Sequence, residues 1–508
     1  MKTHFRLAAW GIALGIGFLS MSEEILWIRV ISFVKNGVPQ AFAFVLAFFL
    51  VGVASGAMAG RYFCSSDSKR TFAHGVWLIL LASLTTLGLP MFIVWSRSME
   101  SFADILLAMA ILISAALKST LFPIAHHLGS EISSQHAGHT ISRVYFLNIA
   151  GSTLGPLLTG FVLLDYFSTQ AMFQFLGISG LLLAVVLAIN NMVARVLVAI
   201  VVILTGVRLV DPAAHEMIIA LAETGDAGEI AKVVENRHGI LHTVDDSSAD
   251  DVVYGGNVYD GRTNIDLRIN SNRIDRVYLL AALHPAPKRV LVIGLSTGAW
   301  TRVLATFPTV EQIDIVEINP GYLRLIQHYD HLSPILTDSR VRVHIDDGRR
   351  WLRHHSREKF DLIVMNVTLH WRAYSTHLLS DEFMHIAYAH LSTGGILAFN
   401  ATGSPDALFT AANVFSHAYR WGSFVYAAEH DFRNQLHVYP STDERVYSLR
   451  WLQQPVLERS KATDRAAVDL MLNQPFIPLA KVSEEMERPL EIITDENMIT
   501  EYKYGRGF

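Results

Sequence analysis

The chain has 508 residues, of which 51% are hydrophobic and only 17% are charged, and its formal net charge is −5. About a quarter of the residues in an ordinary soluble chain are charged, so this composition favours a membrane segment joined to a soluble one. The small net charge and the lack of a basic block argue against a nucleic-acid partner. The single cysteine, Cys64, excludes an intrachain disulfide framework and a cysteine metal cluster, and no metal site is expected.

The excess of apolar residues lies in the first 210 positions, which are predicted to form a polytopic α-helical membrane domain (1–210). Six stretches are close to or longer than the roughly 20 residues that cross a bilayer as a helix. A seventh, 196–207, is only as long as a buried or interfacial helix, so six or seven helices are expected. The six stretches are 7–33, 41–60, 75–95, 104–128, 144–164 and 171–193.

Basic residues at the ends of these stretches indicate how the helices are oriented in the membrane. The positive-inside rule places the N-terminus in the cytoplasm, and the expected location is a bacterial inner membrane. Six spans put the C-terminal domain in the cytoplasm too, which we favour. Seven spans would put it outside, unless the N-terminus is inverted. The residues that share the cytoplasmic side are Lys2, Arg6, Arg61, Lys69, Arg70, Arg143 and Arg195, against Lys35 and Arg97 on the other side.

Ionisable residues also occur inside the apolar stretches, where they are costly. They are expected to pair with each other or to lie at the interfaces, and the alternative is a polar cavity that admits a cationic or amphipathic substrate. They are Glu23, Glu24, Arg29, Lys118, His126 and His127.

The rest of the chain has the patterning of a soluble protein. Residues 211–288 are predicted to be a linker and a small antiparallel β-subdomain, because short apolar runs alternate with Gly, Asn and Asp. Strands and helical patterns then alternate over 289–454, which predicts an α/β Rossmann-like domain of the class I methyltransferase type. Residues 455–508 form a helical or extended tail. The expected strands are 289–294, 312–318, 340–346, 360–366 and 394–400.

The first of these strands runs into a glycine turn in "VLVIGLSTGAW", where Gly294 and Gly298 let the backbone approach a ligand. The second strand ends in Glu317, which can accept hydrogen bonds from ribose hydroxyls. The third ends in Asp346-Asp347, where a carboxylate can bond the adenine amine. Together these residues predict a nucleoside-cofactor site. The same turn spells G-x-S-x-G, but no base is singled out for Ser296, so we interpret Ser296 as a turn residue of the cofactor loop.

The segments "RVLVIGLSTGAWTRVLATFPTVEQIDIVEINPGYLRLIQHY", "VRVHIDDGRRWL" and "FDLIVMN" resemble the spermidine synthase family of aminopropyltransferases. "GFLSMSEEILWIRV" and "SRVYFLNIAGSTLGPLLTGFVLL" resemble the multispanning, membrane-fused branch of that family. The resemblance implies decarboxylated S-adenosylmethionine as donor, an amine acceptor and a possible homodimer. It also implies cofactor-binding roles for Gly294, Ser296, Gly298, Glu317, Asp346 and Asp347.

The residues that would bind the amine acceptor, here called the acceptor half of the site, depart from the family pattern. The acidic D-S-S-D-P loop is replaced by "NVTLHW", with Asn366 in place of the first acid and Leu369 in place of the second. The Y-H-E stretch keeps only its tyrosine, and the GGGDG form of the glycine loop is lost. A changed acceptor chemistry is one explanation, and a retained cofactor fold without that chemistry is the other. The candidate catalytic residues are Asn366, His370 and Tyr374, and the candidate acceptor-binding residues are Tyr278 and Arg372.

Three function classes follow. The first is a membrane-bound aminopropyltransferase acting on a polyamine or another amine. The second is a methyl- or alkyltransferase that uses intact S-adenosylmethionine on a membrane-associated, lipid-like substrate. The third is a non-catalytic polyamine or nucleoside sensor or transporter component. The missing acids of the acceptor loop weaken the case for the first class. The retained cofactor residues Glu317 and Asp347 weaken the case for the third, non-catalytic class. We rank the classes in the order given.

Overall fold

The computed structural model describes residues 2–130, 137–188, 211, 213–225, 228–246, 250–367, 369–438 and 442–508. By its internal contacts the chain divides into two compact units. The first unit comprises Met1–Lys35, Gln40–Ala222 and Glu235–Ile240. The second comprises Asn36–Pro39, Glu223–Val234 and Leu241–Phe508.

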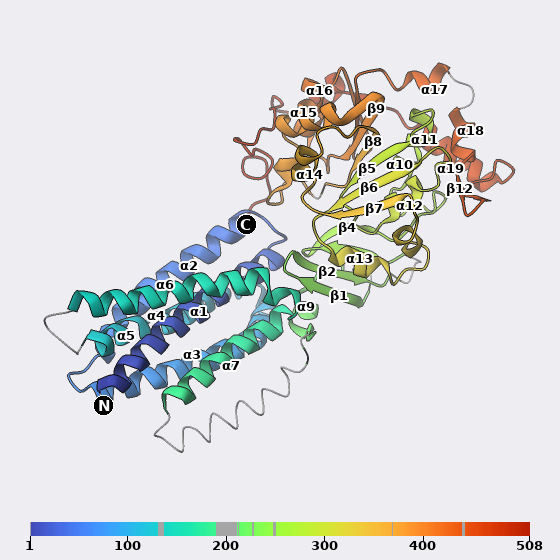
Figure 1. The fold of residues 1–508 in the computed structure, drawn as a ribbon. Coiled ribbons are helices and arrows are strands. Elements are labelled where there is room, and N and C mark those ends of the chain that lie inside the picture. Colours follow the sequence, from blue (N-terminus) through green and yellow to red (C-terminus); the bar gives the residue numbers. More distant parts are fainter. Residues whose placement is uncertain are drawn as a thin grey trace. The chain divides into compact units, whose positions relative to one another are not determined.

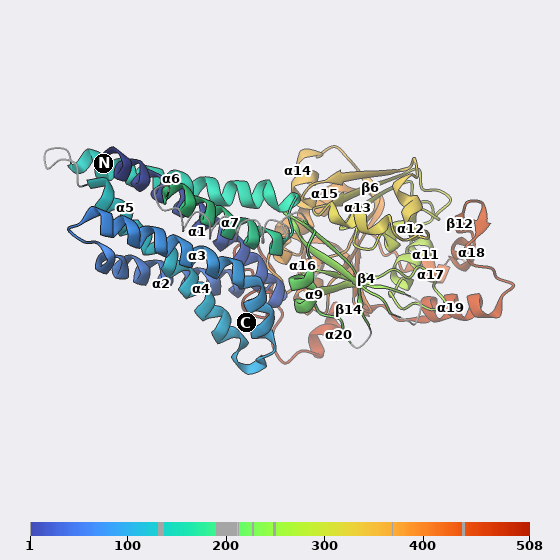
Figure 2. The same ribbon diagram turned by 90° about the horizontal axis from the view of Figure 1, so that it is seen from below.

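The first unit consists of helices that run alongside one another (Figures 1 and 2). Six helical segments of the described chain are long and apolar enough, by length and composition, to cross a membrane. Five of the six predicted stretches fall on these segments, and the sixth, 171–193, does so up to Leu187. Residues 189–193 and the seventh stretch, 196–207, lie outside the described residues. The helices are α1 (Lys2–Val34), α2 (Gln40–Gly60), α3 (Ser68–Arg97), α4 (Ala103–Ser119), α5 (Leu121–Ser130), α6 (Ala137–Phe161), α7 (Thr169–Leu187) and α9 (Glu216–Leu221), with 3-10 turns at Arg61–Phe63, Glu100–Phe102 and Leu163–Asp165.

Small residues let two pairs of these helices approach closely. A Cβ atom at Gly52 or Gly56 of α2 would overlap the carbonyl oxygens of Leu112 and Ala116 on α4. A Cβ atom at Gly151 of α6 would likewise overlap the carbonyl of Leu14 on α1. Glycine is therefore needed at these positions for packing, as is common where apolar helices associate.

One buried pair of opposite charges in the first unit is formed by Glu23 and Lys118. The Nζ atom of Lys118 lies 2.7 Å from Oε2 of Glu23, and the two side chains are 5% and 1% exposed. The Thr86 hydroxyl donates to Oε2 over 2.6 Å, and Ser114 donates to Oε1. The pairing expected of charges in the apolar stretches is thus found for Glu23 and Lys118.

The second unit begins with a small sheet of four strands in the order β1-β2-β3-β4. The pairs β2–β3 and β3–β4 are antiparallel, as predicted for this segment, and the β3–β4 register shifts between Val253 and Tyr254. The strands are β1 (Ile230–Asn236), β2 (Gly239–Val244), β3 (Val252–Gly255) and β4 (Val258–Arg262).

The large sheet has eight strands in the order β14-β10-β11-β9-β8-β5-β6-β7. The five predicted strands form its parallel part, and the Rossmann-like α/β arrangement is confirmed. Three further strands pair antiparallel at one edge, so the sheet is mixed, which the sequence analysis did not predict. The strands are β5 (Arg289–Ile293), β6 (Gln312–Glu317), β7 (Val341–Ile345), β8 (Phe360–Met365), β9 (Leu391–Asn400), β10 (His417–Trp421), β11 (Phe424–Ala428) and β14 (Ile477–Pro478).

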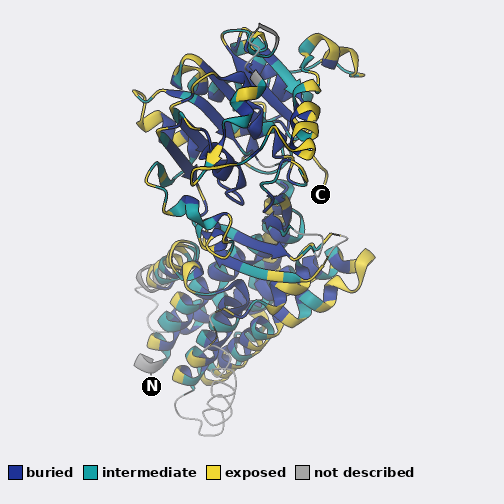
Figure 3. Cartoon of the chain, turned by 90° about the vertical axis from the view of Figure 1, so that its right-hand side faces the viewer, coloured by how far each residue is buried: buried dark blue, intermediate teal, exposed yellow. Residues whose placement is uncertain are grey.

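Alternate side chains of the strands point to opposite faces of this sheet, and each face has its own hydrophobic core. Val290 and Val292 of β5 belong to one core, and Leu291 and Ile293 belong to the other, as the two-residue period of a strand requires. The central strands β5, β6 and β8 are accordingly buried, whereas β7 at the sheet edge is half-exposed (Figure 3). Helices α10 (Asp275–Tyr278), α11 (Leu280–Leu283), α12 (Ala299–Leu304) and α13 (Gly321–Ile326) contribute to the first core, and α14 (Gly348–His354), α15 (Asp381–His390) and α16 (Pro405–Val414) to the second.

The remaining described elements lie mostly in the C-terminal part of the second unit. They are α17 (Asn434–Val438), α18 (Thr442–Tyr447), α19 (Ala462–Asn473), α20 (Leu479–Glu484), the short pair β12 (Arg450–Trp451) and β13 (Gln454–Pro455), and 3-10 turns at Ser333–Leu336 and Ser375–Leu378.

The close approach of α2 to α4 predicts that Gly56→Ala destabilises the first unit. The added methyl group overpacks the helix contact, which typically costs about 1–3 kcal/mol. We expect a lower thermal unfolding midpoint for the detergent-solubilised protein, followed by tryptophan fluorescence. Gly88→Ala in α3 is the matched control, because a Cβ atom there meets nothing within 4 Å. Equal midpoints for the two variants would contradict the packing role of Gly56.

Candidate cofactor and acceptor site

The carboxyl ends of the central parallel strands bring the predicted cofactor residues to one edge of the sheet. Ile293 at the end of β5 pairs with Val316 on β6 and with Met365 on β8. Glu317 ends β6 and pairs with Ile345 at the end of β7. Gly294, Glu317, Asp346 and Asn366 therefore follow or end four neighbouring strands. Ligands of such sheets bind at this edge.

The glycine loop after β5 depends on its two glycines. Gly294 has a φ of +86°, and a Cβ atom there would lie 2.8 Å from the carbonyl oxygen of Asn366. Gly298 has a φ of +77°, and its Cβ atom would lie 2.8 Å from the side chain of Ile335. Any side chain would therefore be strained at both positions and would force neighbouring atoms to move.

Ser296 lies between these glycines with a φ of +47°, and its hydroxyl donates to the carbonyl oxygen of Asp260 over 2.8 Å. The hydroxyl therefore ties the glycine loop to β4. In the described part of the chain no histidine is bonded to it, so the arrangement of a serine nucleophile with its base is not formed.

Glu317 is only 3% exposed, and its carboxylate is held by backbone N–H groups. Leu295 N donates to Oε2 and Asn319 N donates to Oε1, each over 2.7 Å. Burial, helped by the nearby Asp260 carboxylate, raises the pKa of Glu317 to about 7 despite the lowering effect of the backbone N–H groups. The carboxylate thus joins the glycine loop to the end of β6.

The two acids after β7 take local roles. Asp347 caps the N-terminus of α14, where its Oδ1 accepts from Arg350 N over 2.8 Å. Asp346 accepts from Asp347 N over 2.7 Å and forms an ion pair with the Arg350 guanidinium at 2.5 Å. Both carboxylates lie at the sheet edge where the sequence analysis placed them.

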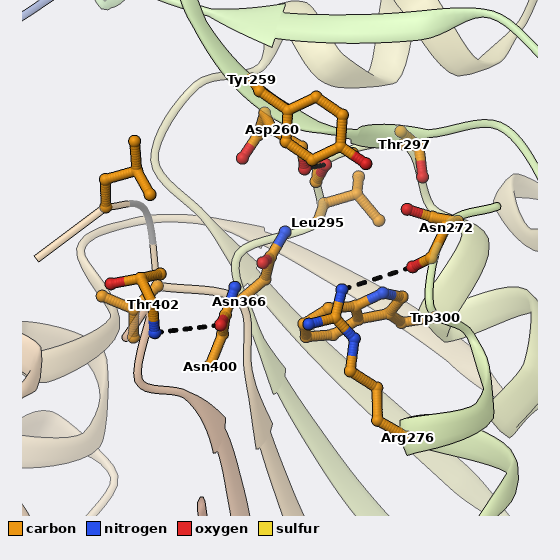
Figure 4. Close-up of a pocket in the computed structure, with 14 residues that line it drawn as sticks. Tyr259, Asp260, Asn272, Arg276, Leu295, Thr297, Trp300, Asn366, Asn400 and Thr402 are labelled. Atoms are coloured by element: carbon orange, nitrogen blue, oxygen red, sulfur yellow. Dashed lines mark hydrogen bonds between the residues drawn. The ribbon is translucent and has the colours of Figure 1, made fainter. Parts of the chain in front are cut away.

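A cavity of about 60 Å³ lies beside the glycine loop (Figure 4). Its wall contains Ser296 and Asn366, whereas Tyr278, His370, Arg372 and Tyr374 do not line it. The residues that line it come from β4, α10, the glycine loop and the segments after β8 and β9, and they are Tyr259, Asp260, Gly261, Asn272, Arg276, Leu295, Ser296, Thr297, Trp300, Asn366, Val367, Leu369, Asn400 and Thr402.

His370 is connected to this cavity through Thr402. His370 N donates to Thr402 Oγ1 over 2.9 Å, and Nδ1 lies 3.1 Å from the Thr402 carbonyl oxygen. A nitrogen that faces a carbonyl carries the proton, so in the neutral ring Nε2 is the acceptor. Burial lowers the pKa of His370, which keeps the ring neutral at pH 7.

Three other predicted residues lie elsewhere. The buried Tyr278 hydroxyl donates to the Ile265 carbonyl over 2.9 Å. Tyr374 is 77% exposed, with a φ of +71°, and its ring stacks on His377. Arg372 is half-buried near Asp260, and its removal from water lowers its pKa. Their catalytic or acceptor-binding roles stay predictions.

Two residues that the sequence analysis did not single out are prominent here. Asp260 is the central residue of β4, and its Oδ2 accepts from the Tyr322 hydroxyl over 2.5 Å. Burial raises the pKa of Asp260. Arg276 lies beside Trp300 at the cavity wall (Figure 4). In sequence, Asp260-Gly261 has only the pattern of a turn, and the "DRVYLL" segment was assessed for its tyrosine alone.

Comparisons with known proteins agree with this geometry. Residues 277–414 match the model of the spermine/spermidine synthase domain. The polyamine aminopropyltransferase of Streptococcus pneumoniae serotype 4 is 34% identical over 130 residues, which are 25% of this chain and 44% of the relative. Polyamine aminopropyltransferase 2 of Streptomyces coelicolor is 28% identical over 349 residues, which are 62% of this chain and 59% of the relative.

Among solved structures, a spermidine synthase in complex with the transition state analogue AdoDATO is similar with a TM-score of 0.39 and 16% identity, over 50% of this chain and 86% of that one. The chain spans less than half the length of the streptococcal relative. The second unit thus contains a region of the spermine/spermidine synthase type, and it is similar in sequence to polyamine aminopropyltransferases.

Proposed function

We propose that the second unit is a transferase of the spermidine synthase type, which moves an aminopropyl group from decarboxylated S-adenosylmethionine to an amine. The observation that carries this proposal is the buried Glu317 carboxylate at the end of β6, next to a glycine loop that a side chain would block. The match of residues 277–414 supports the same donor chemistry.

The donor half provides what an adenosyl ligand needs. Glu317 would accept the ribose hydroxyls, and Asp347 with Asp346 would face the adenine side. Gly294 and Gly298 let the loop pass close to Asn366 and Ile335, where a side chain would force it to move. Both oxygens of Glu317 already hold backbone N–H groups, so its orientation is fixed before the ligand arrives.

The reaction itself is a displacement at carbon. The lone pair of the acceptor nitrogen forms the new C–N bond, the C–S bond breaks, and its electron pair goes to sulfur, which leaves as methylthioadenosine. The nitrogen loses one proton to a base. Because the positive sulfonium already activates the carbon, the protein chiefly positions the two ligands and accepts that proton.

The loop after β8 supplies neutral groups to the acceptor half, in place of the acids of the family pattern. Asn366 lines the cavity and can orient an amine through its amide oxygen, but it cannot take a proton near neutral pH. His370 is neutral at this pH, with Nε2 as its acceptor, and it is the proposed base. Tyr374 is the third candidate of the sequence analysis, although its exposed ring stacks on His377.

We also propose that the first unit lies in a lipid bilayer, as the length and hydropathy of its six helical segments support. A lipid-like acceptor would reach the protein from that bilayer. The side of the membrane that the second unit faces and a homodimer stay predictions.

Glu317→Ala is expected to weaken binding of decarboxylated S-adenosylmethionine at least about 100-fold, because it removes both acceptors for the ribose and the anchor of the glycine loop. Binding is measured by calorimetry on the full chain in detergent, and products are identified by mass spectrometry. The exposed Glu484→Ala is the control for loss of a carboxylate elsewhere in the second unit.

For the wild-type protein with an amine acceptor, methylthioadenosine is the expected product. Release of S-adenosylhomocysteine from intact S-adenosylmethionine would instead favour methyl transfer. Donor binding without any turnover would favour the sensor class. Wild-type affinity in Glu317→Ala would refute the site.

The raised pKa of Glu317 predicts pH-dependent binding of methylthioadenosine. The ribose bonds the charged carboxylate, which must first lose a proton when the pH is below about 7. Affinity is therefore fully present above pH 7 and falls as the pH decreases, by up to about tenfold per unit. Calorimetry from pH 5.5 to 8.5 tests this. Glu317→Gln cannot titrate and should give a flat profile, and parallel profiles for the two proteins would contradict the assignment.

A further inference from the structure

Arg276 introduces a positive charge into the wall of the cavity beside the glycine loop (Figure 4). Its guanidinium lies 5.1 Å from the ring centre of Trp300 and 4.8 Å from that of Phe424. One Nη atom donates to the Asn272 carbonyl over 3.3 Å and the other to the Ser423 hydroxyl over 2.9 Å. Two aromatic rings and two neutral acceptors thus fix the position of the cation.

Within the described part of the chain, the hydrogen bonds of this guanidinium go to neutral acceptors and none of its nitrogens lies within ion-pair distance of a carboxylate, and its Nε atom is buried without a hydrogen-bond partner. The neighbouring Asp275 accepts the backbone N–H of Arg276 over 2.9 Å, and its carboxylate attracts the guanidinium without forming an ion pair with it. Aromatic faces compensate a buried cation only partly. An anion in the cavity would therefore gain more from Arg276 than a cation or a neutral group would.

The one acid that lines the cavity does not cancel this charge. The Asp260 carboxylate accepts from the Tyr322 hydroxyl and lies near the half-buried Arg372, which offsets its negative charge. The other polar groups of the wall, such as Asn366, Asn400 and Thr402, are neutral. Arg276 is therefore the least compensated charge of the wall.

The size of the cavity fits a small ligand group. A buried water needs about 10–15 Å³ measured in this way. The volume of about 60 Å³ thus holds a few water molecules, or the charged end of a short chain. A planar guanidinium that offers several N–H donors suits a carboxylate, which it can bond with two parallel hydrogen bonds.

We propose that this cavity binds the carboxylate of a substrate through Arg276. The proposal rests on the adenosyl site proposed above and specifies the ligand group beside it. The carboxylate has two possible sources. It belongs either to the donor, which would then be intact S-adenosylmethionine in place of the decarboxylated form proposed above, or to an amino-acid-like acceptor. In both cases a fully cationic polyamine is a poor occupant.

Two pairs of probes that differ only by this carboxylate distinguish the sources. Calorimetry on the full chain in detergent compares S-adenosylmethionine with its decarboxylated form. It also compares ornithine with putrescine, with and without saturating methylthioadenosine. We expect the carboxylate-bearing member of one pair to bind at least about tenfold more tightly. A preference in the first pair assigns the carboxylate to the donor, and a preference in the second assigns it to the acceptor.

Substitutions connect that preference to Arg276. Arg276→Gln should abolish it, and Arg276→Lys, which keeps the charge, should retain part of it. Arg433→Gln is the matched control, because the Arg433 guanidinium lies 3.9 Å from the ring centre of Tyr419 and does not line the cavity. Unchanged methylthioadenosine binding shows that each variant is folded.

The outcomes separate the two proposals. Failure of the wild-type protein to bind methylthioadenosine refutes the adenosyl site, and the ornithine–putrescine pair then tests Arg276 alone. Binding of methylthioadenosine with no carboxylate preference in either pair overturns the role of Arg276 and leaves the adenosyl site standing. A preference for the carboxylate-bearing probe that persists in Arg276→Gln also overturns the role of Arg276.

Discussion

A buried carboxylate at the end of β6 holds the functional edge of the second unit together. Glu317 receives one N–H group from the glycine loop and one from the segment that leads into α13. Without it, two backbone donors would be buried without partners, which is costly in a protein interior. The same carboxylate is the group that an adenosyl ligand would use. Folding of the loop and recognition of the ligand thus depend on one side chain, whose raised pKa reflects its burial.

The sequence predicts the central part of this edge well because local rules govern it. The strands β5 to β9 are short apolar runs, and each predicted boundary on the glycine-loop side lies within one residue of the observed strand end. Parallel pairing then places Gly294, Glu317 and Asp346 together, since strand ends meet at one edge. Periodicity and strand order are enough to assemble the donor half.

Long-range packing explains what the sequence did not predict. The strand β14 comes from the C-terminal segment and pairs with β10, almost sixty residues earlier in the chain. Asp260 meets Tyr322 only because β4 lies over α13, and Arg276 reaches the cavity only because α10 packs against Trp300 and Phe424. No local pattern in "YDGR" or "DRVYLL" encodes these partners. The cavity wall therefore becomes visible only once separate segments are in contact.

Two half-buried arginines of the second unit show why their surroundings, and not their burial, indicate a role. Arg372 lies near the Asp260 carboxylate and the Tyr322 hydroxyl, and a Cβ atom at Gly256 would come within 2.6 Å of its guanidinium. It therefore serves to compensate an acid and to pack against the β3–β4 turn. Arg276 has aromatic rings and neutral acceptors around it, but no acid in ion-pair distance within the described chain. A cation that the fold leaves partly uncompensated beside a cavity costs stability, and an anionic ligand is what would recover that cost.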